Sequence, residues 1–139
     1  MSQMWIFLLL TILCWGAAPI LEKYGLRDID PISAVLIRSV AILLMLVVIF
    51  SFSGRISVLW KTPPKTIIIF CLSGFLAGLA GMWTYFKVLK IAPSSKVVPL
   101  VATYPLITAI LSVFILKEGF SWPRIIGTVL IICGVLLVK

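Results

Sequence analysis

Residues 90–122 read KIAPSSKVVPLVATYPLITAILSVFILKEGFSW, and this stretch decides the fold class. Between Lys96 and Lys117 lie 20 residues without a charged side chain. At a rise of about 1.5 Å per residue, they are long enough to cross the ~30 Å hydrocarbon core of a bilayer. The stretch therefore predicts a transmembrane helix.

Two prolines, Pro99 and Pro105, lie inside this predicted helix. A proline in a helix interior leaves the carbonyl four residues back without its donor, and for Pro105 that carbonyl belongs to Val101. At membrane depth such a carbonyl needs a neighbouring helix, a hydroxyl or a water-filled cavity. The candidate residues for lining a substrate path beside this break are Thr103, Tyr104, Pro105 and Thr108. The alternative is a merely bent helix whose hydroxyls bind its own backbone.

The composition excludes a soluble domain. Of the 139 residues, 63% are hydrophobic, only 12 are Lys or Arg and four are Asp or Glu. The mean hydropathy is +1.27. Apolar spans cover residues 4–21, 32–52, 66–86, 97–116 and 122–138, and short charged links join them. We therefore predict an all-α integral membrane protein with five transmembrane helices, forming one domain over residues 1–139 in a lipid bilayer.

The charges and the reactive side chains argue against nucleic acid, metal and catalysis. The net charge is +8, but the cations are scattered singly through the links, where they act as topology determinants. The three cysteines lie inside apolar spans and form no CxxC pair, so we interpret them as packing residues. With no His and no carboxylate cluster, the sequence predicts no metal, no cofactor and no enzyme activity.

The first span is interpreted as a membrane helix and not as a signal peptide. No Lys or Arg precedes it, and it continues past Pro19 to Leu21. Trp15, Gly16 and Pro19 resemble a helix break or a point of close approach, and Trp15 is a candidate residue of the substrate path. Ordinary packing is the alternative, because both glycine and proline are common in membrane helices.

Arg38 is the unusual residue of the second span, which Pro31 opens. It lies about 10 Å into the helix at ~1.5 Å per residue. A guanidinium at such depth costs about 2.5 kcal/mol or more unless it pairs or reaches the interface. We consider Arg38 either a substrate-path residue or a structural anchor. Its possible partners are Glu22, Asp28 and Asp30.

Small residues in the third and fifth spans predict close helix contacts. The pattern SGFLAGLAG repeats small residues four apart, a spacing that lets membrane helices approach. The predicted packing residues are Gly74, Gly78, Gly81, Gly127 and Gly134. At the end of the third span, Trp83, Tyr85 and Phe86 form either an aromatic belt or a cavity lining, and Trp83 is another candidate for the substrate path.

Several of these residues, in this order, resemble an EamA domain of the drug/metabolite transporter superfamily. The matching positions are Trp15, Gly16, Arg38, Ala92, Ser94, Ser95, Tyr104, Pro105, Lys117, Glu118, Gly127, Gly134 and Val135. The resemblance covers essentially the whole chain and implies a transporter fold. Most members carry two tandem copies of this unit, related by inverted topology, whereas this sequence holds one.

The resemblance implies a transporter of small organic metabolites or drug-like compounds. Because one copy cannot enclose a midplane cavity, we expect a dimer whose cavity is lined by the first four helices. Small multidrug resistance relatives place a carboxylate in helix 1, but residues 4–21 offer only Thr11 and Cys14, which argues against proton-coupled efflux of quaternary cations. The alternative function is a non-transporting membrane subunit that stabilises or regulates a larger complex.

The distribution of Lys and Arg predicts how two copies would be oriented. With five helices, five of these cations lie on one side of the membrane and six on the other. So small a difference does not fix orientation, which favours an antiparallel homodimer. A parallel dimer or a heterodimer with a related protein is the alternative. We expect a multi-pass protein of the plasma (inner) membrane of a prokaryote.

Overall fold

A computed structural model describes residues 2–119 and 121–137 of the chain, and it divides into two compact units, Met1–Ile91 and Ala92–Lys139. The prediction of one domain over residues 1–139 stays a prediction.

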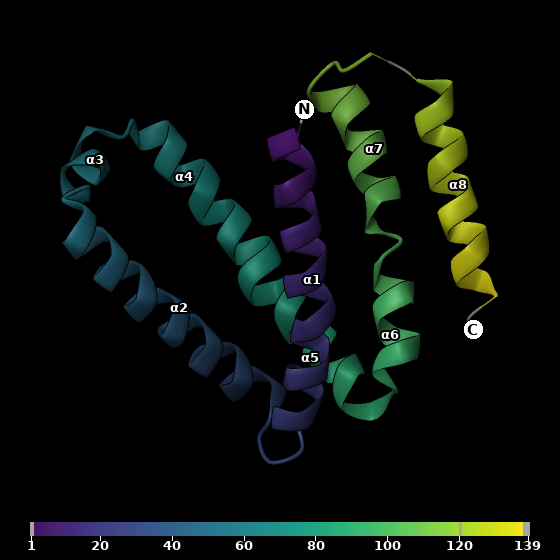
Figure 1. The fold of residues 1–139 in the computed structure, drawn as a ribbon, viewed down its shortest axis with the longest axis horizontal. Helices are drawn as coiled ribbons and strands as arrows, with labels where there is room; N and C mark the ends of the chain where they lie inside the picture. The colour runs from purple at the N-terminus through teal and green to yellow at the C-terminus, as the bar shows by residue number, and fades with distance from the viewer. Residues whose placement is uncertain (1, 120, 138–139) are drawn as a thin grey trace. The chain divides into compact units, whose positions relative to one another are not determined.

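The first unit is a layer of helices joined by short links. Its elements are α1 (Ser2–Gly25), α2 (Pro31–Ser53), α3 (Ile56–Lys61), α4 (Pro64–Ser73), the π-helix η1 (Gly74–Gly81) and α5 (Met82–Ile91). The last three follow one another without interruption, as the ribbon from α4 to α5 in Figure 1 shows. α5 contacts both α1 and α2, and α2 also contacts η1. Among the described residues of this unit, the buried side chains are those of Pro19, Leu26, Val35, Phe86 and Leu89.

The second unit contains α6 (Ser94–Val101), α7 (Tyr104–Ile115) and α8 (Trp122–Leu136). α8 contacts both α6 and α7. Val97 on α6 and Val135 on α8 are its buried apolar residues within the described ranges.

The predicted class, an all-α membrane protein, is confirmed. Within the described residues, four helical stretches are long and apolar enough to cross a membrane: Gln3–Gly25, Pro31–Ser53, Pro64–Ile91 and Ser94–Ile115. A shorter apolar helix, Ile125–Val135, follows. Most apolar side chains are exposed within one chain, as expected where lipid covers them. The predicted fifth span extends to Val138, which lies outside the described residues.

The first helix differs from its prediction in two ways. It runs to Gly25 and not to Leu21, because backbone bonds continue up to Leu26, whose N–H donates to Glu22 O at 2.9 Å. Hydropathy falls at the first charge, but Glu and Lys are good helix formers. The helix is also unbroken at Pro19, so the predicted break there is wrong. One proline removes a single bond, and the turns on both sides continue.

The second helix begins as its sequence indicates. Asp30 is the N-cap and its carboxylate accepts a hydrogen bond from the N–H of Ser33 at 3.1 Å. Pro31 follows in the first turn, where its missing N–H costs nothing. The helix ends at Gly54, whose φ of 64° is the left-handed conformation that glycine adopts easily.

The predicted fourth span is two helices. α6 runs through Pro99 to Val101, and α7 begins at Tyr104 with Pro105 in its first turn. The interruption lies at Ala102 and Thr103, just before the Tyr104–Pro105 start of α7, where the helical winding is disturbed. The π-helix of the third span was not predicted, and neither was the short helix α3.

Candidate functional site

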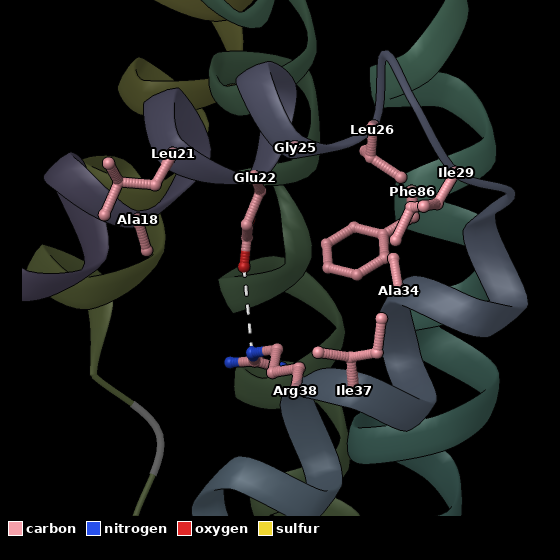
Figure 2. Close-up of a pocket in the computed structure, with 10 residues that line it drawn as sticks. All are labelled: Ala18, Leu21, Glu22, Gly25, Leu26, Ile29, Ala34, Ile37, Arg38 and Phe86. Atoms are coloured by element: carbon pink, nitrogen blue, oxygen red, sulfur yellow. Dashed lines mark ion pairs between the residues drawn. The ribbon is translucent and has the colours of Figure 1, made fainter.

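The candidate site is a pocket in the first unit. Its volume is about 330 Å³, and α1, α2, α5 and the α1–α2 link supply its walls. Figure 2 shows the lining residues, which are Ala18, Leu21, Glu22, Gly25, Leu26, Ile29, Ala34, Ile37, Arg38 and Phe86. Apart from one carboxylate and one guanidinium, these side chains are apolar.

An ion pair spans this pocket. Glu22 Oε1 of α1 lies 3.7 Å from Nε of Arg38 on α2, and Figure 2 shows the two side chains pointing toward one another. The Glu22 side chain is 14% exposed and that of Arg38 is 44% exposed. At 3.7 Å the groups attract each other but are beyond hydrogen-bonding distance. The arginine therefore keeps N–H donors to offer to water or to a solute.

The positions of both charges follow from local structure. Arg38 lies in the second turn after the Asp30 cap, and Glu22 lies in the last turn of α1. Trp15 precedes Glu22 by two helical turns and so shares its face of α1. Phe86 of α5, 2% exposed, forms the wall beside them.

Two lysines hold α5 against the last turn of α1 and the α1–α2 link. The Lys23 ammonium donates hydrogen bonds to the carbonyls of Leu89, at 2.6 Å, and Lys90, at 3.1 Å. Lys90 Nζ in turn donates to the carbonyl of Ile29 at 2.6 Å. The carbonyls at the end of α5 carry the negative end of the helix dipole, so Lys23 is favourably placed. This lysine clasp, Lys23 with Lys90, fixes the pocket wall.

Other predicted site residues lie near this pocket or in the second unit. Trp83 lies one turn before Phe86, and Lys87 Nζ lies 3.8 Å from its ring centroid, a cation–π contact. In the second unit, the Thr103 hydroxyl donates to Leu100 O at 2.8 Å and that of Thr108 to Tyr104 O at 3.4 Å. These hydroxyls therefore bind their own backbone. Whether the residues line a substrate path stays a prediction.

Four of the five predicted packing glycines have open surroundings within one chain, and Gly81 is the exception. A Cβ built on Gly74, Gly78, Gly127 or Gly134 would meet no atom within 4 Å. The same holds for Gly16, the predicted point of close approach. The packing role of these glycines stays a prediction.

A second pocket, of about 350 Å³, lies in the second unit between α7 and α8. Its walls are mostly apolar, with Glu118 and the hydroxyl residues Ser112, Ser121 and Thr128 among them. Within residues 2–119 and 121–137, no group of three or more His, Cys, Asp or Glu could hold a metal ion.

Sequence analysis missed Glu22 as a residue of helix 1. The statement that the first helix offers only Thr11 and Cys14 is wrong, because α1 includes Glu22. The argument against a proton-binding carboxylate in this helix therefore loses its basis. The available signal was the single intramembrane arginine, which requires a partner, and Glu22 was one of three that the sequence offered.

Comparison with known proteins agrees with this architecture. The model of the EamA-like transporter family matches residues 3–139. The chain belongs to the EamA-like transporter family. An "uncharacterized transporter in cobO 3'region" of Sinorhizobium sp is 31% identical over 138 residues, which are 99% of this chain and 97% of that relative. No solved structure matches this EamA chain.

Two archaeal relatives differ in the share of their length that is matched. An "uncharacterized transporter" of Archaeoglobus fulgidus is 29% identical over 139 residues, covering 97% of this EamA chain but 47% of the relative. An uncharacterized protein of Methanocaldococcus jannaschii is 31% identical over 105 residues, covering 76% of this chain and 73% of its own. The chain thus spans nearly all of the Sinorhizobium relative and about half of the Archaeoglobus one.

Proposed function

We propose that this membrane transporter carries small organic metabolites or drug-like compounds as a dimer, and that the pocket around Glu22 and Arg38 is its solute-binding centre. One observation carries the proposal: an ion pair in an otherwise apolar pocket within two predicted membrane spans. The proposal involves no chemical conversion of the solute.

The cost of placing these charges in the membrane supports a role in binding. An arginine inside a membrane span costs about 2.5 kcal/mol or more, and charged residues there commonly mark substrate or ion pathways. Arg38 is paired with Glu22 at 3.7 Å, and the described residues offer its guanidinium no hydrogen bond. A purely structural pair would gain from closer contact. Here the remaining donors face a pocket large enough for a small molecule.

The lengths of the relatives support assembly from two copies. Two tandem units would fill a chain of the Archaeoglobus relative's length, of which this chain matches 47%. We infer that two separate copies supply what two tandem units supply there. The five cations on one side and six on the other favour opposite insertion of the copies. The bacterial and archaeal relatives support the plasma membrane of a prokaryote.

Transport by vesicles that contain the purified protein tests the binding centre. Vesicles with the parental chain, loaded with a mixed pool of metabolites, should release or take up at least one compound that empty vesicles do not. Arg38→Ala, Arg38→Lys and Glu22→Gln should each reduce that rate at least about tenfold, as expected for a lost charged contact of ~1.4 kcal/mol or more.

A matched control separates the site from charge in general. Arg55→Ala removes an exposed arginine after the end of α2, outside the pocket, and should leave the rate unchanged. Parental rates in Arg38→Ala and Arg38→Lys would leave Arg38 as a structural anchor. No transported compound from any broad pool would favour the non-transporting subunit instead.

A further inference from the structure

The third membrane span contains an unusual winding. Gly74–Gly81, with the sequence GFLAGLAG, form the π-helix η1 between α4 and α5. In a π-helix each N–H is directed to the carbonyl five residues back, and this winding is rare, mostly limited to single turns at functional sites. Here it extends over eight residues.

Gly81 is the residue that this winding requires. A Cβ at Gly81 would lie 2.9 Å from the backbone oxygen of Leu76, the carbonyl five residues back. In an α-helix the N–H of residue 81 would be directed to the carbonyl of Ala77 instead. A methyl group at position 81 therefore disfavours the π form. At Gly74 and Gly78, in the same segment, a Cβ would meet nothing within 4 Å.

Thr84 supports the segment where the winding changes. Its hydroxyl lies 2.9 Å from the carbonyl oxygens of both Ala80 and Gly81, the last two residues of η1, and donates to them. This donor stabilises carbonyls at the junction between π and α winding.

The two ends of η1 are held very differently. α5 contacts α1 and α2, buries Phe86 and Leu89, and is fixed by the lysine clasp. α4 has no buried residue, and its main contact within the described part of the unit is η1 itself. A change of winding in η1 would therefore move α4 and leave α5 in place.

We propose that η1 is a rewinding hinge, in which a change between π and α winding turns and shifts α4 relative to α2 and α5. The two windings take different numbers of residues per turn. Each change of hydrogen-bond partner in η1 therefore rotates α4 relative to α5. η1 itself contacts α2, the helix that carries Arg38. The hinge goes beyond the proposed transport function and does not depend on it.

Distances between spin labels test the hinge without any solute. The full chain, with Cys14, Cys71 and Cys133 replaced by serine, would carry labels on cysteines at Met45 of α2 and Ile68 of α4. A reference pair would use Met45 and Val88 of α5. All three positions are well exposed within the chain. Dilution with unlabelled chains in lipid nanodiscs restricts the pulsed electron resonance signal to labels within one copy.

We expect Gly81→Ala to displace the distance between α2 and α4 by about 1.5 Å or more, the rise of one α-helical residue. In the same Gly81→Ala variant, the distance between α2 and α5 should keep its parental value. Gly78→Ala adds the same methyl group and the same helix propensity to η1, and it should leave both distances at the parental values. Unchanged distances in Gly81→Ala, or an equal displacement in Gly78→Ala, would overturn the hinge.

Substitutions at Thr84 give a second route if Gly81→Ala does not fold. Thr84→Val keeps the shape but loses the hydroxyl, so it should displace α4 as Gly81→Ala does, whereas Thr84→Ser should not. A parental distance in Thr84→Val would count against the hinge. Transport assays play no part in these outcomes, so they remain valid whether or not the solute proposal holds.

Discussion

Two ammonium groups join elements that are far apart in the sequence. Lys23 in the last turn of α1 binds the carbonyl of Leu89 on α5, and Lys90 on α5 binds the carbonyl of Ile29 in the α1–α2 link. Nothing in the sequence predicted this clasp, because a lysine near the end of a helix is usually solvated and the partners here are backbone atoms. The predicted role of these cations in topology remains compatible with it.

Lys23→Met should destabilise the fold. The change keeps the length of the side chain but leaves the carbonyls of Leu89 and Lys90 without the ammonium donor, which we expect to cost about 1–3 kcal/mol. The midpoint of thermal unfolding in one detergent measures it. Lys61→Met, at an exposed lysine ending α3, is the matched control. Equal midpoints for the two variants would show that the clasp adds no stability.

The start of α2 should depend on pH. The pKa of the Asp30 carboxyl lies below its ordinary value, chiefly because the carboxylate accepts hydrogen bonds from the side chain and backbone of Ser33. Because the pKa is lower in the folded protein, the charged cap stabilises the fold at pH values above the ordinary pKa of an aspartate. This stabilisation is lost as the pH falls through the pKa that Asp30 has in the folded protein.

Asp30→Asn provides the measurement, because asparagine caps a helix but does not titrate. Parent and variant should differ most in thermal midpoint near neutral pH, and the difference should shrink in the acid range. Asp28→Asn, in the same link, is the control. A difference that stays constant down to low pH would refute the charged cap.

At the scale of elements, the sequence predicted the spans better than their interiors. Apolar runs mark the membrane helices, and Pro105 marks the interruption between α6 and α7. The π winding of η1 was missed because its glycines also fit ordinary close packing. The end of α1 was missed because hydropathy detects charge and not the backbone bonds that continue through Glu22.

The interruption between α6 and α7 makes a prediction about water. Single cysteines in place of Thr103, Tyr104 or Thr108, in the version without native cysteines, should react with a water-soluble thiol reagent in membranes. Polar side chains beside a broken helix are tolerated where water can reach them. Leu130→Cys on α8, exposed within the chain and expected to face lipid, should stay protected.

The same experiment separates the two interpretations of this helix. Complete protection at all three positions in a folded, active protein would mean a dry break, with the hydroxyls satisfied only by Leu100 and Tyr104 carbonyls.

At the scale of the whole molecule, family membership followed from the order of weak motifs and the five-span pattern. The assembly could not be predicted in the same way, because the orientation of each copy depends on a small difference in Lys and Arg between the two sides of the membrane. The clasp agrees with part of the count of Lys and Arg on the two sides of the membrane. It brings the end of α1 and the α1–α2 link to the end of α5, as expected if the cations of these segments lie on one side.

We expect the protein to insert in both orientations. A carboxy-terminal reporter that is active only on one side of the membrane, paired with a second active only on the other, should give comparable signals in cells making this protein alone. Adding two lysines to the α1–α2 link should shift the signals strongly toward one orientation. Signal from a single side with the parental chain would rule out the antiparallel homodimer.

The Glu22–Arg38 pair also bears on how the chain is made. Glu22 precedes Arg38 by 16 residues, so the carboxylate leaves the ribosome first. The two helices can then enter the bilayer as a hairpin whose opposite charges offset each other at the pair, whereas α2 alone would carry an uncompensated guanidinium. We expect α2 to be inserted less efficiently when Glu22 is replaced by glutamine. The carboxylate of Glu22 would thus lower the cost of inserting Arg38 during biosynthesis, before either group contacts a solute.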